Sequence, residues 1–406
     1  MKKSGTLVLL IYMLTACNTT PVVETNTPVK LTQKQVVQHL PCPATDNLIG
    51  TQTTQYITRA CISALEEGSQ YHRLRMLALS AAAFADNDDQ TYAKQIIDYL
   101  VPQVEKRLAH GQKQHLLSLT AVAMASLGDS RQAMNMAARI KGQRQQEWRS
   151  DVYSAIALYY WQQGDVTRFR THLRKVRHPY SYSSTVARLV LHHYNIKYDR
   201  KFYLQLIHSA DNRNHKIDLV QQRIKLNLAM ALACYKLQSH RCSADYLQKA
   251  EQQVRGIKAK DYSFVKRKAH AQLFISRSYA YMYRFDKANE LAGQIKHREW
   301  RAFTLPPLAY SHYQYNHQDK TFELLEQSWA LTEDLKSNLY RSKEGIQTNL
   351  LSDIAVTFTR LGLHHKTEEL AEMLNEPYRR AEVYLDSAQT TQERWLPFSL
   401  DNQDYL

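Results

Sequence analysis

Hydrophobic residues between Ala121 and Ile140 recur at three- and four-residue steps on both sides of the pair Gly128-Asp129. This spacing is typical of amphipathic helices, and a Gly-Asp pair between two such runs predicts a tight turn. The stretch therefore predicts a helical hairpin. A single hairpin leaves a hydrophobic face in contact with water, so its stability requires that other hairpins stack on it.

Copies of this hairpin pattern recur along the chain. Each copy has a small residue seven positions before the turn, usually an aromatic residue four before it, and a small residue five after it. The predicted turn residues are Asp88, Gly128, Gly164, Ser239, Tyr283, Asn316 and Gly362. Seven positions before them stand Ala81, Ala121, Ala157, Leu232, Ser276, Ala309 and Ala355, and five after them stand Ala93, Ala133, Phe169, Ala244, Ala288, Thr321 and Thr367. Small residues on both helices let the two backbones approach closely.

This spacing resembles the tetratricopeptide repeat, in which a small residue and an aromatic residue on the first helix face an alanine on the second. The resemblance covers about Gln70 to Leu385 and implies an all-α fold, a right-handed α-solenoid of about seven to eight stacked hairpins, within residues 47–388. The turns recur roughly every 33 to 46 residues, against a regular 34 in the family, and an eighth, degenerate copy is expected around Lys197 to Leu206. Phe169 and Leu232 depart from the small residues that the family places there.

An aromatic-arginine pair marks the entry to three of the first helices: Trp148-Arg149, Trp300-Arg301 and Tyr378-Arg379. We interpret the aromatic residue as a repeated packing wedge and the arginine as solvated. A cation-binding cage is the alternative, but the pairs are far apart in the sequence and regularly phased.

The N-terminus has the features of a signal peptide over residues 1–16. Met1-Lys2-Lys3 is a short basic leader, Leu7 to Leu14 is hydrophobic, and Leu14-Thr15-Ala16-Cys17 ends the segment with small residues. The last four residues resemble the bacterial lipobox, which implies that Cys17 becomes the lipidated N-terminus. An ordinary secretory signal is the alternative, and it leaves Cys17 unexplained.

Residues 17–46 are predicted to be the lipidated cysteine and a tether, because this stretch is rich in Thr, Val and Pro and has few hydrophobic side chains to bury. Two or more acyl chains hold a protein on a bilayer permanently. The residue after the cysteine is Asn18 rather than an aspartate, which resembles enterobacterial lipoproteins that are sorted to the outer membrane. We therefore expect a lipid-anchored protein of the bacterial outer membrane that faces the periplasm, with exposure on the cell surface as an alternative.

Four cysteines remain in the mature chain: Cys42, Cys61, Cys234 and Cys242. An even number in an exported protein suggests two disulfides, for which three connectivities are formally available. We favour the sequential pairs, one joining the tether to a first helix at about Thr54 to Glu66 and one closing a hairpin turn. A zinc site is disfavoured because the paired C-x-x-C spacing is missing.

The formal charge of the chain is +15, or +13 without Lys2 and Lys3 of the leader. Candidate basic binding-face residues fall in two stretches: Arg168, Arg170, Arg174 and Arg177, and then Lys258, Lys266, Arg267 and Lys268. Arg170, Arg174 and Arg177 share one helix face. Nucleic acid is an improbable partner for an exported lipoprotein, so an anionic envelope polymer, lipid headgroups or an acidic protein is favoured, and a solvated face without any partner is the equal alternative.

Catalytic motifs are missing from the sequence, and so are metal-binding and cofactor-binding motifs. His192-His193, His312, His317 and His364-His365 lack the H-E-x-x-H phasing, and there is no G-x-S-x-G, phosphate loop or glycine-rich fingerprint. We expect no enzyme, no cofactor and no metal, and we interpret these histidines as turn and surface residues.

Two functions follow as hypotheses. The first is a scaffold or adaptor that binds a protein or peptide of an envelope assembly, such as polysaccharide export, pilus or secretion machinery, or peptidoglycan synthesis. The second is a binding module for an anionic envelope glycan or lipid. Residues 389–406 form a C-terminal tail with Trp395, Phe398 and an acidic end. We expect the tail to cap the last hairpin, with an internal occupant or a bait for another protein as alternatives.

Overall fold

The computed structural model describes residues 41–43, 51–104, 108–194, 198–258, 262–296, 298–338 and 343–391, all within the compact unit Pro41–Leu406. In these residues every regular element is an α-helix, and the helices pack in neighbouring pairs, which confirms the all-helical class. The predicted signal peptide, Cys17 and the tail from residue 392 onward lie outside the described residues.

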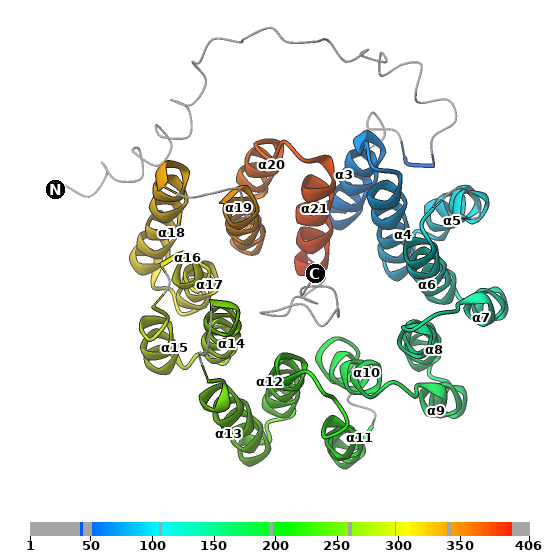
Figure 1. Ribbon diagram of the computed structural model, residues 1–406, viewed down its shortest axis with the longest axis horizontal. Helices are drawn as coiled ribbons and strands as arrows, with labels where there is room; N and C mark the ends of the chain where they lie inside the picture. The colour runs from blue at the N-terminus through cyan, green and yellow to red at the C-terminus, as the bar shows by residue number, and fades with distance from the viewer. Residues whose placement is uncertain are drawn as a thin grey trace, which may run out of the picture. The chain divides into compact units, whose positions relative to one another are not determined.

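Most helices form antiparallel hairpins with a first and a second helix (Figure 1). The hairpins are α4 (Gln70–Asp86) with α5 (Gln90–Val104), α6 (His110–Ser126) with α7 (Ser130–Arg139), α8 (Gln145–Gln162) with α9 (Val166–Lys175), α10 (Pro179–His192) with α11 (Arg200–Asn214), α12 (Val220–Lys236) with α13 (His240–Gly256), α14 (Tyr262–Tyr281) with α15 (Phe285–Gly293), α17 (Leu305–Gln314) with α18 (Gln318–Asn338), and α19 (Lys343–Arg360) with α20 (His364–Glu372). The remaining helices are α3 (Gln52–Glu66), the short α16 (Arg298–Ala302) and α21 (Pro377–Thr391).

Seven hairpins turn through one residue with a left-handed backbone. These residues are Asp88, Gly128, Gly164, Gln238, Tyr283, Asn316 and Gly362. In each turn the following N–H donates to the carbonyl four positions before the left-handed residue, at 2.8 to 3.0 Å, which is the Schellman arrangement that closes a helix C-terminus. At Gly128 and Gly164 the next residue is an aspartate that caps the second helix, so one Gly-Asp pair ends one helix and begins the next.

The prediction for the fourth turn was wrong by one residue. The left-handed residue is Gln238, not Ser239, so the pattern positions shift to Ala231 and Ser243. Both are buried, whereas Ala244, which the sequence pattern assigned to the second helix, is exposed. The apparent exception at Leu232 is thereby removed, because the small residue that the pattern requires is its neighbour Ala231.

The other small residues lie where the pattern predicts, in the contact between the two helices of each hairpin. With the corrected turn, the residue seven positions before every left-handed residue has no exposed surface. In two hairpins a hydroxyl joins the helices: Ser276 Oγ donates to the Ala288 carbonyl at 2.8 Å, and Thr367 Oγ1 donates to the Ala355 carbonyl at 3.0 Å. Phe169 fits without a small side chain because its ring packs on Trp161, with 5.1 Å between ring centroids.

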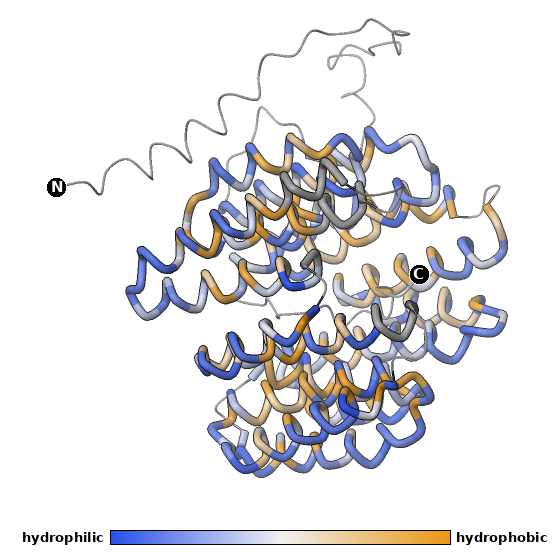
Figure 2. The backbone as a smooth tube through the Cα atoms, turned by 60° about the vertical axis from the view of Figure 1, so that its left-hand side comes forward, coloured by the Kyte–Doolittle hydropathy of each residue, from blue (hydrophilic) through white to orange (hydrophobic). Residues whose placement is uncertain are grey.

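The degenerate copy expected around Lys197 to Leu206 corresponds to the hairpin of α10 and α11. Its helices are joined by residues 193–199, a longer connection than the tight turns, and α11 begins at Arg200 with Asp199 as its N-cap. Along the backbone tube in Figure 2, hydrophobic and hydrophilic residues alternate within the helices, as expected for helices that bury part of their circumference.

The first helices contact one another in a closed circuit. α4, α6, α8, α10, α12, α14, α17, α19 and α21 each contact the next, and α21 contacts α4. α21 has no second helix after it among the described residues; instead it packs extensively on α3, from the other end of the sequence (Figure 1). α3 also contacts α20, so it takes the place of a second helix for α21.

We call the contact of α3 with α20 and α21 the seam. Tyr56 of α3 is fully buried; its hydroxyl bonds to His364 Nδ1 at 2.9 Å and its ring stacks on Tyr384, with centroids 6.1 Å apart. Thr53 and Thr391 share a hydrogen bond of 2.7 Å. Arg59 pairs with Glu368 at 3.0 Å, and Arg380 pairs with Glu66. The two ends of the described helical array therefore cover each other.

Candidate partner-binding surfaces

Polar side chains connect three successive first helices at two places, which together we call the first polar cluster. Arg277 of α14 forms an ion pair with Asp353 of α19 and donates to the Phe303 carbonyl at 3.0 Å. Arg360 of α19 lies over the ring of Tyr310 of α17, 3.9 Å from its centroid. Burial raises the pKa of Asp353 against the opposing effect of Arg277, and burial lowers the pKa of Arg360 to about 10, which keeps its guanidinium charged at neutral pH.

A second cluster lies at the beginning of α4, α6 and α8. Tyr71 bonds to His115 Nδ1 at 2.6 Å, and the His115 ring stacks on Trp148 with centroids 5.8 Å apart. Arg144 covers Trp148 at 5.4 Å and donates twice to the buried Glu147, at 2.6 and 2.9 Å. The guanidinium of Arg144 already occupies the face of Trp148, which supports the packing interpretation of this ring over a cage for an external cation.

Arg149, predicted to be solvated, instead binds the end of the preceding helix. Its guanidinium donates to three carbonyls at the end of α7, those of Ala137, Ala138 and Ile140, at 2.7 to 3.0 Å. Arg380 makes the same kind of bond to the Leu374 carbonyl at 2.8 Å. Because the last carbonyls of a helix have no partner within it, a cation there satisfies them and complements the helix dipole. Of the predicted pairs, Arg301 is exposed, whereas Arg379 pairs with Glu382.

The first basic stretch forms an exposed face on α9 and just after it. Arg168, Arg170, Arg174 and Arg177 are all exposed. Arg168 lies over Tyr160 at 5.3 Å and Arg170 over Phe202 at 5.4 Å, so aromatic rings from α8 and α11 support two of the four cations. Between them His172 is buried, and burial, followed by the charges of Lys175 and Arg168, lowers its pKa.

The second basic stretch lies at the connection between α13 and α14. Lys258 and Arg267 are exposed and Lys268 is half-buried, while the side chain of Lys266 lies outside the described residues. No extensive contact joins α9 to α13 or α14 in the described part of the chain, so we treat the two stretches as separate surfaces.

The cysteines lie in the sequential pairs. The Sγ atoms of Cys42 and Cys61 are 2.02 Å apart, and those of Cys234 and Cys242 are 1.98 Å apart, which is bonding distance. The first pair attaches Cys42 to α3, and the second spans the turn between α12 and α13.

The histidines do not gather into a metal site. His312 and His317 are neighbours, with 3.3 Å between their Nδ1 atoms, and Phe285 stacks on His312. Among the described residues, no group of three or more histidines, cysteines or carboxylates is close enough to share a metal ion. His364, predicted to be a surface residue, instead hydrogen-bonds Tyr56 in the seam.

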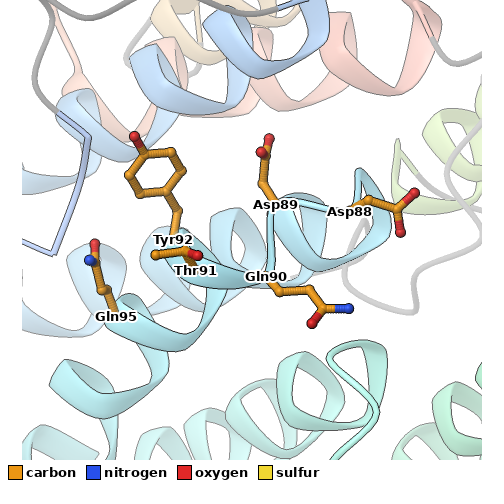
Figure 3. Close-up of a pocket in the computed structure, with 6 residues that line it drawn as sticks. All are labelled: Asp88, Asp89, Gln90, Thr91, Tyr92 and Gln95. Atoms are coloured by element: carbon orange, nitrogen blue, oxygen red, sulfur yellow. The ribbon is translucent and has the colours of Figure 1, made fainter.

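One open hollow of about 570 Å³ lies at the start of α5, lined by Asp88, Asp89, Gln90, Thr91, Tyr92 and Gln95. Figure 3 shows that these side chains point in different directions rather than toward a common centre. Asp89 already accepts hydrogen bonds from Thr54 and Asn87, both at 3.1 Å. The hollow therefore lacks the converging polar groups of a small-molecule site.

Sequence reasoning missed the seam and the two polar clusters. The available signal for the seam was an unpaired helix at each end, one before the first hairpin and one after the last turn. The sequence gives no signal for the partners of Arg59, Arg277 and Arg360. The partners of Arg59 and Arg277 are 76 or more residues away in the sequence, and Arg360 contacts its partner ring only by packing.

Among the described residues no helix combines the length and hydrophobicity that a bilayer crossing requires. No protein-family model matches the chain, and the comparison with curated proteins found no match.

Proposed function

We propose that this protein is a scaffold or adaptor that binds a protein or peptide of a cell-envelope assembly. The observation that supports this best is the closed circuit of first helices. It brings charged and aromatic side chains of different hairpins together, as in the ion pair of Arg277 with Asp353 and the contact of Arg360 with Tyr310. Arrays of stacked hairpins use such surfaces, built from several copies, to bind extended partners. In finer detail we propose hairpins of the tetratricopeptide kind, about seven to eight of them, stacked with a right-handed superhelix.

The proposed location is the periplasmic side of the bacterial outer membrane, with Cys17 as the lipidated residue. Cys42, among the first described residues, is joined to α3 by the disulfide with Cys61. Polysaccharide export, pilus or secretion machinery and peptidoglycan synthesis are the assemblies in which we would look for the partner.

The test is affinity purification of the lipidated protein from crosslinked envelopes, followed by mass spectrometry. The matched control carries Arg277→Gln and Asp353→Asn, which removes both charges of this ion pair without changing the net charge. A partner recovered with the natural protein and lost with the control supports the proposal. Equal recovery of every protein with both variants contradicts it.

We expect Cys17→Ser to abolish acylation and leave an unprocessed precursor. The substitution removes the thiol to which the diacylglyceryl group would be attached. Metabolic labelling with a palmitate analogue measures the acylation, and gel mobility measures the processing. Incorporation of the label into the substituted protein would show that the lipobox assignment is wrong.

The second candidate function is binding of an anionic envelope glycan or lipid, and the exposed arginines of α9 favour it. For the unlipidated chain from Asn18, we expect Arg170, Arg174 and Arg177→Ser to weaken binding to phosphatidylglycerol vesicles by about 100-fold, since each basic residue near an anionic surface contributes about 1 kcal/mol. Co-sedimentation at increasing salt measures it, because screening weakens such contacts.

The matched control for this prediction replaces Lys94, Arg131 and Arg241, three exposed cations on α5, α7 and α13, by serine. It removes the same charge from other surfaces. If both triple variants lose the same affinity, the α9 face has no specific role and only the net charge of the chain acts.

A further inference from the structure

α12 is buried around its whole circumference. Every residue from Ile224 to Cys234, about three turns, is buried. The sequence of this segment, I-K-L-N-L-A-M-A-L-A-C, is hydrophobic on all sides, and a helix of this kind needs covering groups on every face.

The first helices α4, α6 and α8 are not covered in this way. The small residue that faces the second helix stands seven positions before the left-handed turn residue. The residues 13, nine and six positions before that turn residue lie on other sides of the helix, at roughly 120°, 160° and 100° around its axis from the small residue. They form what we call the free face. In α4 and α8 these residues are only half-buried: Arg75, Leu79, Ala82, Asp151, Ala155 and Leu158. In α12 they are Lys225, Ala229 and Leu232, and none has any exposed surface.

The helical array does not account for this difference. α4, α6, α8 and α12 each contact their own second helix and the first helices on either side. In α6 the free-face residues Leu119 and Val122 are half-buried with this set of neighbours. The neighbouring α10 resembles α12, since every residue from Tyr180 to Ala187 is buried. We extend the name free face to the side of α10 that adjoins the free face of α12. An additional segment over these adjoining faces would account for their burial.

The chemistry of this surface specifies the covering segment. Leu232 and Ala229 require hydrophobic contacts, and Lys225 brings an ammonium group that lies 5.0 Å from the centroid of the Phe274 ring. A buried ammonium is stable only where anions or acceptors accompany it. A segment with large hydrophobic side chains that also carries acceptors or negative charge matches this surface.

Residues 392–406 have this composition and begin directly after α21. Trp395, Leu396, Phe398 and Leu400 are followed by Asp401 and Asp404. Fifteen residues can extend over as much as about 50 Å, more than the diameter of a small domain. We propose that the adjoining free faces of α10 and α12 are a binding site for an extended aromatic-acidic peptide, and that the chain's own residues 392–406 occupy it.

This proposal goes beyond the proposed function, because it names the binding face and the chemistry of the ligand. It also names an internal occupant that an external peptide must displace. It also holds whichever envelope assembly the protein serves. The prediction that the tail caps the last hairpin would place the same residues elsewhere, over α21.

The test is chemical footprinting of the purified protein with an acetylating ester, with Lys225 and the exposed Lys94 read out by mass spectrometry. Deletion of residues 392–406 is expected to raise acetylation of Lys225 by at least about tenfold and to leave Lys94 unchanged. If Lys225 stays protected from acetylation in a folded deletion variant, the proposal is overturned. The cover would then be the residues before 41 or a second copy of this chain. Because no partner is present, this result is independent of the scaffold function.

If the deletion variant loses its helical circular dichroism, the full-length variant Trp395→Ser/Phe398→Ser replaces it. The same rise at Lys225 is expected, and unchanged protection overturns the proposal. A fluorescein-labelled peptide of residues 392–406 should bind the deletion variant and not the full chain. The peptide with serine in place of Trp395 and Phe398 is the matched control; equal binding of both peptides, or no binding to a folded deletion variant, contradicts the assignment.

Discussion

Replacing Tyr56 with alanine is expected to lower the free energy of unfolding by about 3–5 kcal/mol, the range for removal of a large buried aromatic side chain. Tyr56 is fully buried in the seam, between His364 and Tyr384. The ion pair of Arg59 with Glu368 is about one-third exposed, so it contributes little and cannot compensate for the lost ring. Urea denaturation followed by circular dichroism measures the change.

Tyr56→Phe is the matched control, because it keeps the ring and removes only the hydroxyl that bonds His364. We expect it to cost about 1 kcal/mol. Small-angle scattering of Tyr56→Ala adds a second measurement, since separation of α3 from α21 increases the radius of gyration. If Tyr56→Ala unfolds at the same urea concentration as the natural protein, the seam does not stabilise the fold.

Replacing Ala121 with tryptophan is expected to cost on the order of 1–3 kcal/mol or more, because an indole must be inserted where two helices touch. Ala121 has no exposed surface and faces the second helix of its hairpin, as does Ala355 in α19. The midpoint of thermal unfolding should fall for Ala121→Trp and for Ala355→Trp. An unchanged midpoint for both would mean that these alanines do not lie between helices.

Ala138→Trp is the control, because it makes the same alanine-to-tryptophan change at an exposed position. Ala138 lies on α7, in the same hairpin as Ala121. The same design tests the corrected fourth turn. Ala231→Trp should destabilise the protein, whereas Ala244→Trp, at an exposed position that the uncorrected pattern placed in the contact, should have little effect. The opposite result would restore Ser239 as the turn residue.

The hairpins could be predicted from the sequence because their determinants are local. A left-handed residue follows the first helix in each of the seven tight turns, and glycine adopts that conformation most easily. Gly128, Gly164 and Gly362 therefore mark their turns directly. Gln238 adopts the same conformation, with φ of 57°, without being a typical residue for it. The sequence pattern therefore selected the adjacent Ser239, which resembles a turn residue more closely.

The surfaces could not be predicted to the same degree because their determinants are distant in the sequence. The exposure of the α9 arginines follows from their position on a single helix. The bonds of Arg149 to the end of α7 depend on how one hairpin meets the next, and the ion pair of Arg277 with Asp353 depends on the placement of three first helices. Neither relation has a periodicity that a single sequence displays.

The seam also restricts how this protein can change in length. In an open array each hairpin contacts only its neighbours, so duplication or loss of one hairpin leaves the remaining contacts intact. Here α21 must arrive at α3 after the full series of hairpins, and an added or deleted copy would carry it past or short of that position. The buried ring of Tyr56 would then face water. The number of hairpins is thus fixed by closure, and a tandem duplication within this gene would be a destabilising change rather than a neutral one.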